Sequence, residues 1–262
     1  MPAFHEEVLL RTGPHELMRY CCDGHDEPKP EREEVRSTQL MLVVRGAFEV
    51  RNARGRSIAD PSAIYVQTEG DEHIIRHPQD GGDVCLTVRG PIATRWARAY
   101  QGRVTVDPRR WLEIVRVAQD PAADGLALEE AVLGALPGEK PAPDPHPLAD
   151  AIAHQIALCY AEPRGLSELA SAVGISEFHA CRVFRRARGT TIHQHRDALR
   201  LAHAASLLLD TDQSIAEIAT RVGFASQAHL THRMSRAYGQ TPAALRRAQR
   251  GVKRVTRPVQ GR

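Results

Sequence analysis

The sequence predicts an α+β protein, with a β-rich first half joined to an all-helical second half. Three observations carry this prediction. Short runs of β-forming residues fill the first 90 residues, helical spacing dominates after residue 147, and a proline-rich stretch lies between the two parts. A chain of 262 residues is long enough for two domains, so we expect two.

The first half reads as antiparallel β-structure. Runs such as QLMLVVRGAFEVRN and DVCLTVRG are separated by turn signals such as Asp60-Pro61, a pattern typical of a barrel or a sandwich. After residue 91 the spacing becomes helical in IATRWARAYQ, DPRRWLEIVRVAQD and ALEEAVLGAL, with Asp107 and Pro108 as cap and first turn. Residues 1–135 are therefore expected to form a β-domain with accessory helices, which would contact either a second copy of the chain or their own sheet.

A proline-rich linker is expected over residues 136–147, which contain five prolines in twelve positions. The charge balance changes sign there. Residues 1–147 hold 18 basic and 24 acidic residues, whereas residues 148–262 hold 17 basic and 8 acidic ones. A basic half indicates a polyanion partner such as nucleic acid, although a solvated basic surface would give the same balance.

Several protein classes are disfavoured by the composition. The chain is 42% hydrophobic and 26% charged, and it shows neither a leader-like N-terminus nor a long apolar run, so we expect a cytoplasmic protein without a membrane segment. Five scattered cysteines are a poor disulfide framework. Without a P-loop, nucleophile elbow or dinucleotide fingerprint, the sequence predicts no enzyme and no catalytic residue.

The second half reads as seven helices and repeats one pattern. The helices are expected at about Leu148–Cys159, Ser167–Val173, Ser176–Arg188, Ile192–Leu209, Ile215–Arg221, Ser226–Tyr238 and Pro242–Arg250. Five residues (Ser176, His179, Arg186, Gly189 and Thr191) recur 50 positions later, and Glu168, Ala170 and Gly174 recur 49 positions later. A short helix, a glycine break and a Ser-capped helix make a helix-turn-helix, so the repeat predicts two such units.

The second copy, IAEIATRVGFASQAHLTHRMSRAYGQTPAALRR, resembles the signature of the AraC (AraC/XylS) family of transcription regulators. The resemblance covers residues 148–250 and implies a seven-helix DNA-binding domain, followed by a basic tail over residues 251–262. Independently, the helix expected over Ile192–Leu209 would span about 27 Å, near the roughly 34 Å between successive major grooves. One chain could then place both second helices on one face of a duplex.

Helix faces predict which side chains meet DNA. Base contacts are expected from Phe178, Cys181 and Arg182 in the first unit and from Gln227, Ala228, Thr231 and His232 in the second. Phosphate contacts are expected from Arg185, Arg186, Arg233 and Arg236. The sequence departs from the family pattern at His232, where Arg is common, and at Leu230, Met234 and Leu245, where aromatic residues are frequent.

The family resemblance implies a cupin-like antiparallel β-barrel in residues 1–135, which would sense an unknown small-molecule effector or mediate homodimerisation. It also makes activation through RNA polymerase the expected mode. No cofactor is expected, except that Cys22, His25, His77 and Cys85 are a candidate metal set. Two alternatives remain: a metal-dependent cupin-type enzyme, or a repair regulator that accepts an alkyl group on Cys21 or Cys22.

The sequence thus predicts a sequence-specific regulator of transcription that binds double-stranded DNA through two successive major grooves.

Overall fold

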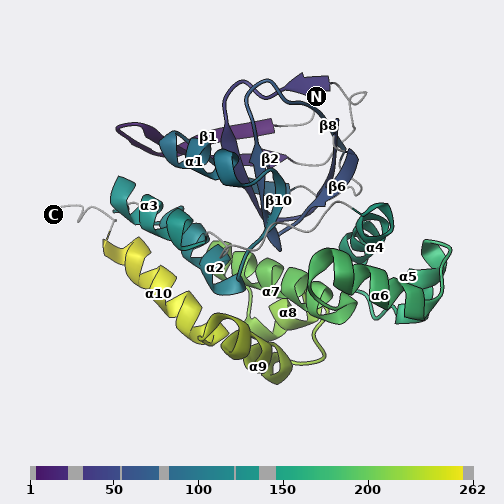
Figure 1. Ribbon diagram of the computed structural model, residues 1–262. Coiled ribbons are helices and arrows are strands. Elements are labelled where there is room, and N and C mark those ends of the chain that lie inside the picture. Colours follow the sequence, from purple (N-terminus) through teal and green to yellow (C-terminus); the bar gives the residue numbers. More distant parts are fainter. Residues whose placement is uncertain are drawn as a thin grey trace.

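Figure 1 shows the computed structural model, which describes residues 4–22, 32–53, 55–76, 83–120, 122–135 and 146–255. The first half contains two antiparallel sheets. The six-stranded sheet has the order β1 (Phe4–Thr12), β2 (His15–Cys22), β9 (Asp83–Arg89), β4 (Gln39–Arg45), β7 (Ala63–Gln67) and β10 (Gly102–Thr105). The four-stranded sheet has the order β3 (Arg32–Glu34), β8 (Glu72–Arg76), β5 (Phe48–Asn52) and β6 (Gly55–Ala59).

The expected cupin-like antiparallel β-barrel is not closed, because the described strands pair within two separate antiparallel sheets. The chain crosses from one sheet to the other between β4 and β5. The β4–β9 register shifts between Val43 and Arg45, and Gly46 then takes a left-handed conformation with φ 85°. Apolar side chains such as Met41, Phe48 and Tyr65 pack together at this crossing. The runs QLMLVVRGAFEVRN and DVCLTVRG do form strands, namely β4, β5 and β9, but β1 and β2 were not among the runs that the sequence singled out. The sandwich alternative is closer to the observed arrangement.

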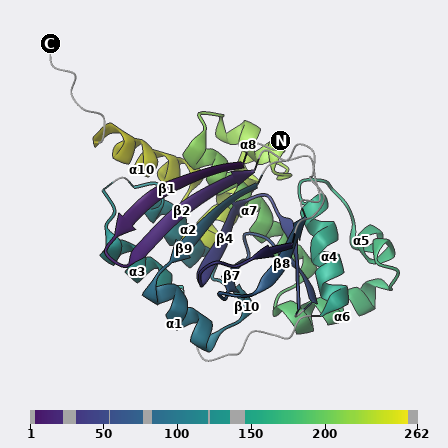
Figure 2. The same ribbon diagram turned by 90° about the horizontal axis from the view of Figure 1, so that it is seen from above.

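Three helices cover the six-stranded sheet: α1 (Pro91–Ala99), α2 (Pro108–Val117) and α3 (Gly125–Gly134) (Figure 2). The expected cap of α2 is confirmed, because the Asp107 side chain accepts a hydrogen bond from Arg109 N at 2.8 Å. Trp96 of α1 and Trp111 of α2 are both fully buried against the sheet. These helices therefore pack on their own sheet in this chain.

The second half consists of helices throughout its described length. They are α4 (Pro147–Leu158), α5 (Leu166–Ala172), α6 (Glu177–Arg188), α7 (Ile192–Asp210), α8 (Ile215–Arg221), α9 (Gln227–Tyr238) and α10 (Pro242–Val255). Each observed start lies within one residue of the start expected from the sequence. No helix among the described residues is long and apolar enough to cross a bilayer.

The two halves share a continuous core. Leu207 and Leu208 of α7 belong to the same buried cluster as Leu42 of β4, and Ile58 of β6 is buried with residues of α4. Figure 1 shows α7 running beneath the sheets, with α2 between the sheet and α9. Of the expected linker, residues 136–145 lie outside the described part of the chain, and Pro147 already begins α4.

Candidate nucleic-acid interface

The first helix-turn-helix consists of α5, a tight turn and α6. Gly174 has φ 70°, which lets Ile175 N donate back to Ala170 O at 3.1 Å and closes the turn. The Ser176 hydroxyl then accepts a hydrogen bond from His179 N and caps α6. Ala170 is buried, so α6 can cross close to α5.

The outer face of α6 is open and basic. Phe178 is 76% exposed, and the guanidinium of Arg182 lies over its ring, 5.8 Å from the centroid. Cys181, Arg185 and Arg186 are also exposed. The opposite face is buried through Ala180, Val183 and Phe184, as the sequence predicts. This face of α6 can therefore offer an apolar group and three cationic groups to a ligand without disturbing the core.

The second unit, α8 and α9, has the same local construction. Ser214 and Glu217 cap α8 reciprocally, with Ser214 N donating to Glu217 Oε2 at 2.7 Å. Gly223 turns the chain with φ 87°, and the Ser226 hydroxyl accepts a hydrogen bond from His229 N at 3.1 Å to cap α9. The one-residue longer turn thus preserves both the left-handed glycine and the Ser cap.

The outer face of α9 is polar and less basic. Gln227, Ala228, His232 and Arg236 are exposed, and Thr231 is half-buried. The inner face is closed by residues that are fully buried, namely Leu230 and Met234. Apolar side chains therefore fill these two positions, where the family often has aromatic ones.

Arg233 differs from the other three arginines that were expected to contact phosphate. Its guanidinium pairs with the buried carboxylate of Asp197 on α7. His193 Nδ1 also approaches that carboxylate, at 3.6 Å. A phosphate would have to compete with Asp197 for Arg233, whereas Arg185, Arg186 and Arg236 are exposed. The contacts of all four arginines with DNA stay a prediction.

A buried charge network fixes the junction between the first unit and the sheets. Arg188, at the end of α6, donates to Asp150 of α4 at 2.5 Å, and His195 of α7 lies 3.3 Å from Asp60 in the β6–β7 turn. Burial works against ionisation of Asp60, but His195, Arg103 and Arg188 outweigh it and hold the pKa of this carboxyl well below its usual range. Burial lowers the pKa of His195, although the neighbouring Asp60 carboxylate acts in the opposite direction.

The second unit is held by α2, a contact that the sequence did not reveal. Trp111 stacks on Tyr238 of α9 with ring centroids 6.3 Å apart, and its indole N–H donates to Val43 O of β4 at 3.1 Å. Arg109 Nε donates to Ala237 O at 3.3 Å. These partners lie more than 60 residues apart, so no local pattern could have paired them.

The cysteines do not assemble into a site within the described residues. Cys21 and Cys22 of β2 and Cys85 of β9 lie on adjacent strands, but no group of three or more His, Cys, Asp or Glu residues able to hold a metal occurs there. His25 and His77 of the expected metal set lie outside the described residues. Burial raises the pKa of the Cys21 thiol, which works against the thiolate that alkyl acceptance requires.

Comparison with known proteins places the helical half among regulators. A family model described as a helix-turn-helix domain matches residues 169–248. The transcriptional regulator GlxA of Rhizobium meliloti (strain 1021) is 36% identical over 102 residues, which make up 39% of this chain and 32% of GlxA. The probable transcription factor PqrA of Proteus vulgaris is 35% identical over 81 residues, or 31% of this chain and 66% of PqrA.

Among solved structures, the DNA-binding domain of AdpA in complex with a target DNA is 31% identical to this chain. The match covers 43% of this chain and 100% of that domain, with a TM-score of 0.38. This chain matches less than two thirds of the length of GlxA and of PqrA. Both relatives are named as regulators of transcription, and the family model matches only the helical half of this chain.

Proposed function

We propose that this chain, which belongs to the AraC family of transcription regulators, recognises a specific duplex sequence with both of its helix-turn-helix units. The observation that carries the proposal is the pair of helices α6 and α9. Each buries one face in the core and leaves the other open and polar or basic. The 19 residues of α7 between the units span about 28 Å, which suits two successive major grooves.

The two open faces divide base contacts from phosphate contacts. On α6, Arg182 can bond a guanine edge with two N–H groups, and Phe178 can cover a thymine methyl. On α9, the exposed Gln227 can bond an adenine edge. Arg185, Arg186 and Arg236 would bind phosphates, which fix the register of the protein on DNA without reading sequence.

Regulation extends the same proposal. The first half would respond to a small-molecule effector and support a homodimer, and the bound protein would activate transcription through RNA polymerase. The core that the two halves share supports effector control, because a change in the sheets would reach α7 directly and α9 through α2. The basic tail over residues 251–262 would add sequence-independent attraction to phosphates.

Selection of bound sequences from a random duplex library with the full-length protein tests the proposal. We expect enrichment of two short blocks about 10 bp apart, since the two helices would enter grooves one turn apart. Binding that falls with salt in the same way for every sequence, without enrichment, would contradict sequence-specific recognition.

The substitution Arg182→Ala tests direct readout on the selected site. We expect a loss of about 1–3 kcal/mol of binding free energy and a relaxed preference at one position of one block. Gln227→Ala should relax a position in the other block. The exposed Arg95 on α1 serves as a matched control, because Arg95→Ala removes the same charge far from both helices. If Arg182→Ala weakened binding equally on all sequences, Arg182 would be a phosphate contact rather than a base contact.

A further inference from the structure

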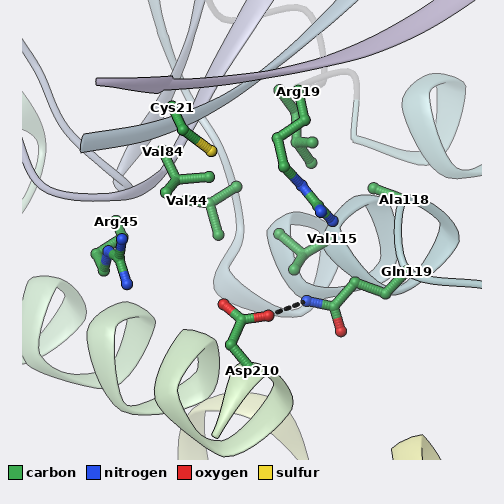
Figure 3. Close-up of a pocket in the computed structure, with 10 residues that line it drawn as sticks. Arg19, Cys21, Val44, Arg45, Val84, Val115, Ala118, Gln119 and Asp210 are labelled. Atoms are coloured by element: carbon green, nitrogen blue, oxygen red, sulfur yellow. Dashed lines mark hydrogen bonds between the residues drawn. The ribbon is translucent and has the colours of Figure 1, made fainter. Parts of the chain in front are cut away.

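A cavity of about 190 Å³ lies where the six-stranded sheet, α2 and the end of α7 meet (Figure 3). It is lined by Arg19, Cys21, Val44, Arg45, Val84, Leu86, Val115, Ala118, Gln119 and Asp210. The walls therefore come from β2, β4, β9 and the end of α2 in the first half and from the last residue of α7 in the second half. No residue of the helix-turn-helix faces described above lines this cavity.

The sheet supplies two cationic groups to the cavity. Figure 3 shows Arg19 and Arg45 on either side of the space above Asp210. Arg19 is shared with Glu7, whose carboxylate lies 3.2 Å away on β1, but Arg45 forms no ion pair with any described residue. A half-buried guanidinium without an anion is a ready partner for a carboxylate, which it can bind through two parallel N–H groups.

The helical half supplies an acceptor on the opposite side. The Asp210 carboxylate points toward the cavity and is oriented by two hydrogen bonds, from Gln119 Nε2 at 3.1 Å and from the Ser206 hydroxyl at 3.1 Å. Two donors leave lone pairs of the carboxylate unused. A cationic donor such as an ammonium group fits this position.

Between the charged groups the lining is apolar. Val44, Val84, Leu86, Val115 and Ala118 offer methyl groups but no hydrogen-bonding side-chain atoms. At about 30 Å³ for each water molecule, the space holds about six water volumes, which suits a compact molecule with a short alkyl part. The two charged sides of the cavity, the apolar wall between them and the small volume together suit a ligand whose carboxylate and ammonium group are separated by very few atoms.

We propose that this cavity binds a small apolar α-amino acid, with its carboxylate on Arg45, its ammonium group on Asp210 and its alkyl side chain against the valine-rich wall. Such a zwitterion satisfies both charged sides of the cavity at once. A simple carboxylate would leave Asp210 without its partner, and a simple amine would leave Arg45 without one.

Because of where the cavity lies, the effect of ligand binding would be transmitted to both helices that are proposed to read DNA. Asp210 ends α7, the helix that joins the two units, and Val44 follows Val43, whose carbonyl accepts the Trp111 indole N–H. Trp111 in turn stacks on Tyr238 of α9. The ligand would therefore stabilise one arrangement of sheet, α2 and α7. This regulatory meaning rests on the proposed function, whereas binding itself does not.

Calorimetric titration of the full-length protein with L-alanine, lactate and propionate tests the proposal. The three probes are similar in size and differ in the group beside the carboxylate. We expect L-alanine to bind at least tenfold more tightly than propionate, with lactate weaker than L-alanine because its hydroxyl is uncharged. Absence of binding by L-alanine at millimolar concentration, or equal binding of L-alanine and propionate, would overturn the proposal.

Three variants separate the contacts. Arg45→Gln should weaken L-alanine binding at least tenfold, and Asp210→Asn should remove most of the preference for L-alanine over propionate. Ala118→Met should fill the space and block all three probes, which tests the cavity without removing a charge. Arg95→Gln is the matched control and should bind like the parent protein. Unchanged binding in Arg45→Gln with native circular dichroism would place the ligand elsewhere.

The same preparations should also be used for sequence selection, so that the two ideas can fail separately. Enriched duplex sequences without amino-acid binding would reject the cavity ligand and leave the regulator intact. Amino-acid binding without enriched sequences would reject the proposed DNA recognition and leave the cavity site intact.

Discussion

The two helix-turn-helix units share a local sequence pattern, but different chemistry holds them in the molecule. Arg188 and Tyr238 occupy equivalent positions, each one residue before the glycine that ends its helix. Arg188 is buried in an ion pair with Asp150, whereas Tyr238 is buried against the Trp111 ring. The repeat therefore encodes the shape of each unit, and residues outside the repeat determine how each unit is anchored.

A second pair of equivalent positions shows the same contrast. His195 and Leu245 each follow a capping threonine by four residues and are fully buried. His195 contacts the Asp60 carboxylate of the first half, whereas Leu245 lies in an apolar cluster. The first unit is thus anchored mainly by buried charged groups, and the second mainly by ring stacking and apolar packing. Removing a buried charge should therefore destabilise the first unit most, whereas a change in side-chain shape should destabilise the second unit most.

The largest effect is expected from breaking the buried ion pair of the first unit. Arg188→Met leaves the Asp150 carboxylate buried without its cation and should cost about 3–5 kcal/mol of the free energy of unfolding. Burial raises the pKa of Asp150, and Arg188 is the largest of the neighbouring charges that act against this rise. Urea unfolding at pH 7 measures the loss.

Two controls sharpen that prediction. The double variant Arg188→Met with Asp150→Leu replaces the pair by apolar groups and should recover much of the stability, because neither charge then remains buried alone. Arg186→Met removes an exposed arginine from the same helix and should change stability by less than about 0.5 kcal/mol. A double variant no more stable than Arg188→Met would contradict an ionic anchor.

These anchors also mark what sequence could and could not predict. Helix starts and caps in the second half followed from Ser176, Ser226 and the glycines that end the preceding helices, because capping depends on neighbours within a few residues. The outward direction of Arg182 and the inward direction of Leu230 followed from helical periodicity. Such signals are local, so one sequence was sufficient to find them.

Long-range partners were not predictable in the same way. The ion pair between Arg233 and Asp197 joins residues 36 positions apart. The stacking of Trp111 on Tyr238 joins residues 127 positions apart. The division of the strands into two sheets depends on a register shift before Gly46, and register is fixed by pairing rather than by the strand alone. The cavity brings together residues of β2, β4, β9 and α7 that are far apart in the sequence, which is why no local motif indicated it.

The next largest loss of stability is expected in the glycine turns of the two units, which differ in the space around the glycine. A Cβ atom at Gly223 would lie 2.3 Å from the Ala161 carbonyl oxygen, whereas one at Gly174 would meet nothing within 4 Å. Both glycines have positive φ, so either substitution by alanine costs about 1–2 kcal/mol of backbone strain. Gly223→Ala adds a backbone clash and should cost about 3 kcal/mol in total. Urea unfolding of the two matched variants provides the comparison, and equal losses would deny the close approach of the second turn to the end of α4.

We expect the free energy of unfolding to depend on pH through a buried histidine of α7, the helix between the two units. His203 of α7 stacks near Tyr160, which follows α4, with ring centroids 4.2 Å apart. Burial, with Arg45 and Arg221 adding repulsion, lowers the pKa of His203 to about 4. The unfolded chain binds this proton below about pH 6.5, but the folded chain binds it only near pH 4. The free energy of unfolding should therefore fall as the pH falls through this window.

The size of that effect is bounded by one proton, or at most about 1.4 kcal/mol per pH unit. His203→Phe removes the titrating group, so its free energy of unfolding should fall less steeply than that of the parent between pH 6.5 and 5. Urea unfolding of both proteins at several pH values gives the two slopes. Parallel slopes would show that His203 does not remain neutral in the folded protein.

The smallest expected effect tests whether the two helix-turn-helix units, which are anchored differently, make equivalent phosphate contacts with DNA. Arg186 and Arg236 are equivalent in the repeat and are both exposed, so each alanine variant should lower the slope of log affinity against log salt by about one. Arg185 corresponds to Ser235, so only Arg185→Ala should remove a further contact. Filter binding of the selected duplex across a salt series measures these slopes. An Arg236→Ala slope equal to that of the parent protein, beside a reduced Arg186→Ala slope, would mean that the second unit approaches DNA without that phosphate contact.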